Sequence, residues 1–476
     1  MKGIEFQELE IDILRNAIKS IEEKSKRMQI SDPNIKKILS IVEDFLDKNK
    51  LICYGGTAIN NILPYEDQFY DKSIELPDYD FFSTNPVEDA KELVDIYVKE
   101  GFNEVEAKAG IHFGTYKVFV NFIPVADITY LDPVIYNSLK KESIKIDGIY
   151  YAAPNFLRMS MFLELSRPNG DVSRWEKVLK RLTLLNKHFP LKTKECDEVK
   201  IQRIFSDTKI NKADQDKIFY TVRNALLKDN VVFFGAFANR LYLKNLNEFK
   251  KSKFQKIPDF DVLSEEPERT ATIVKERLRD AGFKHVKIVK KKELGEIIAP
   301  HYEVFVGNDT VAFVYEPLAC HSYNKIKIGN NFVKIATIDT MLSFYLAFLY
   351  ANRPYYDSDR ILCMAQYLFK VQQQNRLRQK GILRRFTMNC IGTQKTIESI
   401  RKEKSDKYNE LKSQRGTKEY DKYFLKYFPQ ETNSKTKKER KNKTKKNDNQ
   451  RKTNNNKKTV SKKKGLLERI EDVFKI

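Results

Sequence analysis

Two aspartates that flank a tyrosine, Asp78 and Asp80, stand a short distance after a glycine pair, Gly55 and Gly56. The segment 76–83, LPDYDFFS, has the composition of a short strand, in which alternate side chains point to the same face. Both carboxylates would then project together and repel each other unless a cation lies between them. Mg²⁺ suits such a place, because it typically takes one or two protein carboxylates together with substrate phosphates. The sequence therefore predicts metal-dependent chemistry on a phosphate compound.

The glycine pair follows a short apolar run and precedes a helical pattern. Glycine lets backbone N–H groups approach a phosphate where a Cβ atom would obstruct, so we expect Gly55, Gly56 and Thr57 to position a triphosphate. Ser83, just past the acidic strand, is a further candidate contact; the alternative is that its hydroxyl is structural. The phosphate-loop signature GxxxxGK[ST] is absent, which argues against the common NTPase class. No group of histidines and cysteines has the spacing of a zinc site.

A third acid is expected, because one ion of a two-metal site activates the attacking hydroxyl while the other holds the triphosphate. Residues 115–131 contain two strand-like apolar runs, and Asp127 is the acid within them. An aspartate between Ala126 and Ile128 would be costly to bury without a partner. We therefore predict that Asp78, Asp80 and Asp127 are the catalytic and metal-binding residues; the alternative is that Asp127 ends a strand and faces water.

Four stretches, YGGTAIN, LPDYDFFS, VEDAKELVDIYVKEGF and VADITYLDP, resemble the catalytic poly(A) polymerase of large nucleocytoplasmic DNA viruses. This group includes poxviruses, African swine fever virus and giant amoebal viruses, and it lies within the polymerase-β-like nucleotidyltransferase superfamily. The match covers about residues 48–190. It implies template-independent transfer of adenylate from ATP to RNA 3′ ends, with Mg²⁺ or Mn²⁺. It also implies that Arg158 contacts the nucleotide or primer; the alternative is a structural role, such as a salt bridge to Glu164 or Asp171.

The same resemblance implies partners and a place of action. Giant-virus forms resemble self-associating enzymes, which implies a homodimer, whereas poxvirus forms work with a methyltransferase-like processivity subunit. The implied localisation is the host cytoplasm, in the viral factory, and also the virion.

A second copy of the motif follows the first. Residues 231–237, VVFFGAF, repeat the pattern of 51–57, and residues 257–264, IPDFDVLS, repeat that of 76–83. This indicates a duplicated domain. The second copy keeps both strand acids, but Phe313 falls opposite Asp127 in our alignment, and Glu316 would replace that acid only if the alignment were shifted. We expect the second copy to be inactive.

The predicted fold class is therefore α+β, with two tandem polymerase-β-like nucleotidyltransferase domains, the second degenerate. A helical N-terminal segment precedes them, and Pro33, after Asp32, is expected to begin its second helix. The expected division is 1–48 helical segment, 49–190 catalytic domain, 191–214 connection, 215–385 degenerate domain, 386–430 helical region, 431–464 disordered basic tail and 465–476 short amphipathic helix.

The net charge of +22 favours a polyanionic partner such as RNA. Residues 431–464 hold 15 Lys/Arg and 3 Asp/Glu, so this tail would either attract RNA phosphates or only add solubility. No apolar run is long enough for a membrane span, and the N-terminus lacks a signal-peptide pattern. The five cysteines, well separated and odd in number, predict buried thiols in a reducing compartment rather than disulfides.

Three competing functions stay open at this point. One is another template-independent RNA nucleotidyltransferase, which adds uridine or matures tRNA ends. The second is a non-catalytic RNA-binding subunit of an RNA-processing complex, which the intact first set of acids disfavours. The third is nucleotidyl transfer to a small molecule, which the basic body and tail disfavour.

Overall fold

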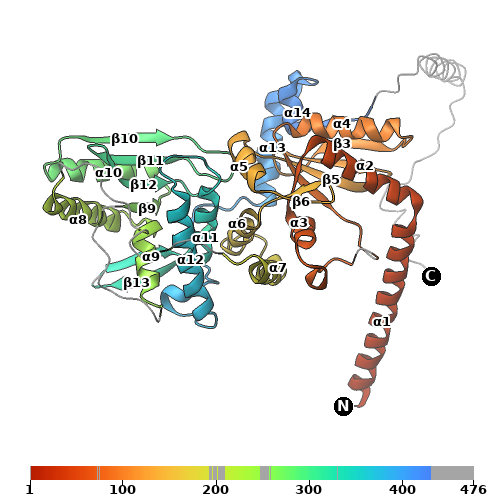
Figure 1. Ribbon diagram of the computed structural model, residues 1–476, viewed down its shortest axis with the longest axis horizontal. Coiled ribbons are helices and arrows are strands. Elements are labelled where there is room, and N and C mark those ends of the chain that lie inside the picture. Colours follow the sequence, from red (N-terminus) through yellow and green to blue (C-terminus); the bar gives the residue numbers. More distant parts are fainter. Residues whose placement is uncertain are drawn as a thin grey trace, which may run out of the picture. The chain divides into compact units, whose positions relative to one another are not determined.

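The structure is a computed structural model, shown in Figure 1, and it describes residues 2–71, 73, 75–191, 196, 201, 210–246, 257, 259–329 and 331–429. The predicted basic tail and the terminal amphipathic helix lie outside these residues, as does most of the predicted connection 191–214.

Each half of the chain combines helices with one mixed sheet. The helices are α1 (Lys2–Ser31), α2 (Pro33–Asn49), α3 (Gly55–Ile62), α4 (Pro86–Lys99), α5 (Pro133–Glu142), α6 (Pro154–Leu165), α7 (Trp175–His188), α8 (Lys212–Lys228), α9 (Gly235–Leu243), α10 (Pro267–Asp280), α11 (Ile338–Phe348), α12 (Ser358–Gln374), α13 (Ile397–Leu411) and α14 (Lys418–Phe424). The strands are β1 (Ile52–Cys53), β2 (Tyr79–Ser83), β3 (Val105–Ala109), β4 (Thr115–Val120), β5 (Ile123–Tyr130), β6 (Ile144–Ile146), β7 (Ile149–Tyr151), β8 (Val232–Phe234), β9 (Phe260–Leu263), β10 (Val286–Lys291), β11 (His301–Val306), β12 (Asp309–Tyr315), β13 (His321–Ile328), β14 (Asn331–Ala336), β15 (Cys390–Ile391) and β16 (Lys426–Tyr427).

The two sheets have one topology. The first has the strand order β16-β3-β4-β5-β2-β1-β7-β6, and the second has β10-β11-β12-β9-β8-β14-β13-β15. Without the edge strands β16 and β15, the orders correspond strand for strand. The orientations agree as well: β2 runs parallel to β5 as β9 does to β12, and β1 lies antiparallel to β2 as β8 does to β9. The duplicated fold predicted from the sequence is therefore confirmed.

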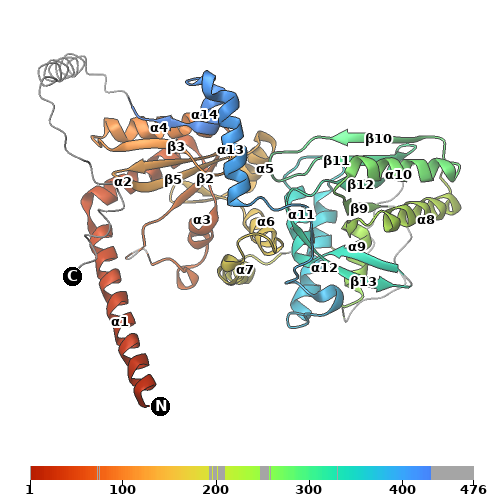
Figure 2. The same cartoon turned by 180° about the vertical axis from the view of Figure 1, so that it is seen from behind.

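The region after residue 385 does more than the helices predicted for it. It supplies an edge strand to each sheet: β15 pairs with β13 of the second sheet, and β16 pairs with β3 of the first. Figure 2 shows α13 and α14 lying along the first sheet, in blue against orange. The chain thus returns to the first half after completing the second. Sequence patterns missed these strands because each has only two residues.

Aromatic packing holds the first sheet between its helices. Phe81 faces α2, where its ring lies 6.3 Å from that of Phe45. Phe82 points to the opposite face and meets Phe156 of α6 at 5.6 Å. In the described residues, α6 makes its main contact outside the first half with α11 (Figure 1). Alternation along β2 thus joins the sheet to both of its helical layers.

Four of the five cysteines form disulfides, so the prediction of unpaired thiols is wrong for them. Cys196 is bonded to Cys363 and Cys320 to Cys390, each pair with Cα atoms 5.2 Å apart. Sequence separations of 167 and 70 residues hide this proximity, which the tertiary fold creates. Cys53 is unbonded and buried in β1, as expected for a core residue. Among the described helices, none has the length and apolar character to cross a bilayer.

Candidate active site

The parallel pair β2 and β5 brings two of the predicted acids together. Asp80 on β2 is the register partner of Asp127 on β5, so the two side chains leave the same face of the sheet. Asp78 precedes β2, which begins at Tyr79 and not at residue 76 as predicted. The backbone turns sharply here, because the Asp80 N–H donates to the Asp78 carbonyl at 3.2 Å. Asp78 therefore approaches Asp80 through a turn rather than through strand alternation.

The acids share a site with excess negative charge. Burial raises the pKa of Asp80 to about 7, and the charges of Asp78 and Asp127 add to this shift. Burial and the charge of Asp127 also raise the pKa of Asp78. Lys117 lowers both pKa values, and Arg174 lowers that of Asp80, but these cations do not cancel the effect. A bound cation would relieve the repulsion.

Lys117 on β4 is an unpredicted member of the site. It is the register partner of Asp127 on the neighbouring strand, and its ammonium forms an ion pair with the Asp127 carboxylate. In the described part of the chain, no group of three acidic, histidine or cysteine side chains closes around one metal position. The oxygen donors of the three acids still suit a hard divalent cation, and the raised pKa values indicate a place for positive charge.

The glycine turn lies against these acids. Gly55 has a φ of +72°, and a Cβ atom built on it would lie 2.6 Å from Asp80 Oδ2. Glycine is therefore required here by the acid as well as by the backbone conformation. Helix α3 begins directly at Gly55, and no side chain caps its first turn. Its N–H groups and the positive end of its dipole suit an anion.

Thr57, the third residue of the predicted triphosphate contact, supports the turn before β2 through its hydroxyl. Its hydroxyl donates to the Asp78 carbonyl at 2.7 Å, and the residue is buried. Thr57 therefore fixes the turn that holds Asp78.

Arg181 on α7 lies beside Gly56 and was only one of several basic positions in the sequence. A Cβ atom on Gly56 would lie 2.9 Å from an Arg181 guanidinium nitrogen and 2.4 Å from the Tyr70 hydroxyl. Arg181 donates to that hydroxyl at 2.7 Å and lies over the ring of Phe69 at 4.6 Å. Its spacing from Arg174 and Lys177, at i, i+3 and i+7, was the available signal. The guanidinium and the amino end of helix α3 are both positive and repel each other. An anion bound between them would stabilise this arrangement.

Two further candidate contacts, Ser83 and Arg158, take part in local hydrogen bonds. Ser83 is buried, and its hydroxyl accepts from the Asn85 N–H at 2.8 Å, directly before α4. Arg158 is 1% exposed. Its guanidinium donates to the side chains of Asn155 and Asn186 and to the Phe189 carbonyl, which ties α6 to the end of α7. Neither side chain has a donor or acceptor directed to the acids, because folding uses those groups elsewhere.

The register of the second copy agrees with the prediction. Asp261 on β9 is the partner of Phe313 on β12, which is the place that Asp127 takes opposite Asp80. Glu316 lies beyond the end of β12 and does not enter this register. The second copy therefore has no carboxylate at the position of Asp127; the nearest acid in this register is Glu303 on β11, which takes the place of Lys117.

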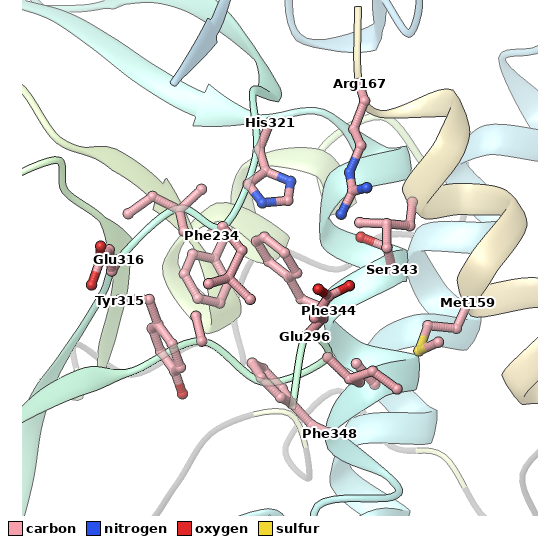
Figure 3. A pocket seen from close by; sticks show the side chains of 16 residues that line it. Met159, Arg167, Phe234, Glu296, Tyr315, Glu316, His321, Ser343, Phe344 and Phe348 are labelled. Carbon is pink, nitrogen blue, oxygen red and sulfur yellow. The ribbon is translucent and has the colours of Figure 1, made fainter. Parts of the chain in front are cut away.

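A small cavity of about 40 Å³ lies elsewhere, where α6 meets α11 and the second sheet (Figure 3). Arg167 and His321 lie side by side at one edge of it and both point into it. Burial and the charge of Arg167 lower the pKa of His321 to about 3, so this imidazole is neutral at pH 7. None of the predicted site residues lines this cavity. It belongs to the packing between the two halves and not to the acidic site.

Comparison with known proteins finds sequence similarity in the first half of the chain, which contains the acidic site. Residues 40–171, which include the three acids and the glycine turn, match the family model of the poly(A) polymerase catalytic subunit. The predicted resemblance is confirmed.

Two relatives carry the name "Putative poly(A) polymerase catalytic subunit". The protein of African swine fever virus (strain Badajoz 1971 Vero-adapted) is 33% identical over 188 residues, which are 38% of this chain and 39% of that protein. The protein of Acanthamoeba polyphaga mimivirus is 32% identical over 187 residues, 38% of this chain and 30% of that protein. The matched stretch thus spans well under half of each relative.

A solved structure extends the likeness in fold. The crystal structure of the Megavirus polyadenylate synthase superposes with a TM-score of 0.73 over 93% of this chain and 89% of that chain, at 21% sequence identity. The two-domain architecture is therefore shared well beyond the stretch that is similar in sequence.

Proposed function

We propose that this chain is a template-independent polynucleotide adenylyltransferase, which adds AMP from ATP to RNA 3′ ends in the host cytoplasm. The observation that carries the proposal is the pairing of Asp80 with Asp127, beside Asp78 and the glycine turn, inside the stretch that matches poly(A) polymerase catalytic subunits. A phosphoryl-transfer centre needs clustered carboxylates next to a phosphate cradle, and these residues supply both.

In this reaction the RNA 3′ hydroxyl oxygen bonds to the α-phosphorus of ATP, and its proton passes to water. The bond from the α-phosphorus to the oxygen that bridges to the β-phosphate breaks, and pyrophosphate leaves with that oxygen. Asp78, Asp80 and Asp127 would hold the divalent cation, Mg²⁺ or Mn²⁺. When bound, such a cation lowers the pKa of the attacking hydroxyl and neutralises negative charge on the phosphates. Lys117 would hold the Asp127 carboxylate in position until the site is loaded, since the two side chains form an ion pair.

The triphosphate would lie at the amino end of α3. The N–H groups of Gly55 and Gly56 would donate to it there, and Arg181 would approach from α7. The Arg181 guanidinium is held in position by Tyr70 and Phe69, so little side-chain freedom is lost on binding.

The proposal is tested by extension of a labelled oligo(A) RNA with each NTP supplied alone, with Mg²⁺ or Mn²⁺. We expect long products from ATP, and none from the Asp80→Ala variant. Extension with UTP in place of ATP would identify a uridylyltransferase, and addition limited to a few C and A residues would identify a tRNA-end enzyme. If no NTP extends any primer while RNA binds, the chain is a non-catalytic RNA-binding subunit.

We also propose that a second copy of this chain is the partner, rather than a methyltransferase-like subunit. Helix α1 carries an exposed apolar seam with the 3,4 spacing of a coiled coil, formed by Ile11, Leu14, Ile18, Ile21 and Met28. In a parallel pair, Glu10 would flank the seam opposite Arg15 of the second copy, so the charges are complementary. A helix of 30 residues this exposed is marginal alone.

Sedimentation equilibrium tests this pairing. Ile18→Glu places a charge in the seam and should give a monomer at concentrations where the unmodified chain is dimeric. Ile13→Glu is the matched control, because Ile13 is 71% exposed and lies off the seam, and it should leave the dimer intact. The same molecular mass for the unmodified chain and Ile18→Glu would contradict the proposal.

A further inference from the structure

A pocket of about 290 Å³ lies where the β3–β4 hairpin loop meets α13 and α14. The start of this loop, residues 110–114, is tied to the C-terminal region by two hydrogen bonds. Lys404 donates to the Gly110 carbonyl at 2.7 Å, and the Ala109 N–H donates to the Leu425 carbonyl at 2.9 Å. The pocket therefore exists only because the chain returns to the first sheet after the second domain.

An exposed aromatic pair forms one wall of this pocket. The rings of Phe113 and Tyr423 lie 4.6 Å apart and are tilted by 33°. Phe113 is 56% exposed, so much of its apolar surface faces water. A ring held in this way offers a flat surface on which a nucleobase can stack.

Four lysines surround the aromatic pair: Lys395, Lys404, Lys407 and Lys422. Lys407 lies over the Tyr423 ring at 5.4 Å. Three of the lysines pair with glutamates at the surface, at 2.7–3.0 Å. Exposed pairs of this kind contribute little stability, so a phosphate can take the place of the carboxylate at small cost. Glu296 and Glu403 also line the pocket, so the lining residues carry four lysines and two glutamates. Glu410 and Glu419, the partners of Lys407 and Lys422, lie outside the lining.

The loop leads directly to the acidic site. Strand β4 begins at Thr115, two residues after Phe113, and carries Lys117, the partner of Asp127. At about 3.3 Å per residue, Phe113 lies at most roughly 13 Å along the chain from Lys117. A strand of RNA with its 3′ end at Asp127 could reach this pocket with a nucleotide close upstream.

We propose that this pocket binds a nucleotide of single-stranded RNA upstream of the 3′ end, with the base stacked on Phe113 and the flanking phosphates on the lysines. The proposal rests on the proposed function for the position of the 3′ end. Its chemistry is that of sequence-tolerant single-strand binding, in which stacking and backbone charge act together.

The test measures binding of a fluorescent oligo(A) RNA of about 15 nucleotides to the full chain, without ATP or divalent cation. We expect Phe113→Ala to weaken binding about tenfold, which corresponds to one lost stacking contact. Phe113→Tyr should retain affinity, because it keeps the ring. Phe122→Ala is the matched control: Phe122 is 83% exposed, lies on the β4–β5 turn and does not line the pocket. All variants carry the same basic tail, so its contribution cancels.

A second variant separates charge from stacking. Lys404→Gln combined with Lys407→Gln should reduce the salt dependence of binding, whereas Phe113→Ala should leave that slope unchanged. The inference is overturned if Phe113→Ala binds RNA as tightly as Phe122→Ala, an outcome that would reassign the aromatic pair to a protein contact.

The result is independent of catalysis. If the unmodified chain binds RNA through this pocket but extends no primer, the proposed adenylyltransferase activity is contradicted and the proposed RNA site is supported. If Phe113→Ala extends the primer with an unchanged KM for the primer, the proposed activity is supported and the proposed RNA site is contradicted.

Discussion

In the first sheet Asp80 lies across from Asp127, whereas in the second sheet Asp261, at the same place, lies across from Phe313. The strands around these residues have one topology, so the difference comes from side chains alone. The Phe313 ring has no oxygen with which to coordinate a divalent cation, so the charge of the remaining acids must be met in another way.

The second copy meets that charge with a protein side chain. Arg360 of α12 lies 3.3 Å from Asp259, the counterpart of Asp78, and both are almost fully buried. Removing one member of a buried ion pair is costly, which gives a structural reason for the second copy to keep its acids. In the first copy the corresponding acids carry raised pKa values instead, which indicates charge not yet compensated.

The glycine turns differ in the same direction. A Cβ atom on Gly235 would lie 1.8 Å from Asp261 Oδ2, compared with 2.6 Å for Gly55 and Asp80. The acid of the second copy therefore lies closer to its glycine turn, where a phosphate would have to bind. The second copy thus differs from the first in two ways: it has no acid at the position of Asp127, and its glycine turn leaves less room for a phosphate.

The largest expected effect is the difference in the rate of primer extension between substitutions of Asp80 and of Asp261, the corresponding acids of the two copies. Asp80→Ala should lower the rate of primer extension about a thousandfold or more, because the electrostatic centre of the reaction is lost. Asp261→Ala should leave the rate of folded protein within about twofold, although its melting temperature should fall because the substitution removes a buried polar side chain. Initial rates and thermal unfolding of both variants test this. Equal loss of rate would mean that the second copy takes part in catalysis.

A smaller effect is expected at the phosphate cradle. Arg181→Ala should raise the KM for ATP by about tenfold to a hundredfold, with a smaller change in kcat, because a charge-assisted contact to the triphosphate is lost. Lys180→Ala is the control on the same helix, since Lys180 pairs with Glu176 and is 74% exposed. Tripolyphosphate binding, followed by calorimetry, gives a readout apart from activity. An unchanged affinity in Arg181→Ala would place the triphosphate elsewhere.

The smallest effect concerns stability. The pKa of Asp80 is raised from 3.8 to about 7 in the folded chain, so its contribution to stability is complete below pH 3.8 and is lost as the pH rises toward 7. Asp80→Asn removes the charge and should raise the melting temperature at pH 8 in EDTA by several degrees, with little change near pH 4. Asp44→Asn, at an exposed position of α2, should change it little at either pH. A lower melting temperature for Asp80→Asn at pH 8 would show that the acid is stabilised by its surroundings.

The sequence by itself determined the positions that the backbone requires. The Asp-x-Asp motif, the glycine turn and the repeat were readable because strand spacing and the glycine requirement act over a few residues, and the predicted placement of Phe313 opposite Asp127 followed from them. Pro33 at the start of α2 was predictable for the same reason, since Asp32 caps that helix locally.

Only the tertiary structure decided which side chains surround the acids. Lys117 meets Asp127 through strand pairing, and Arg181 reaches Gly56 from a helix more than a hundred residues later in the chain. Arg158 and Ser83 had suitable chemical types, but burial and local hydrogen bonds use their donors and acceptors. The disulfides and strand β16 join segments far apart in sequence. Contacts of this kind depend on how whole elements pack, and no local pattern records that packing.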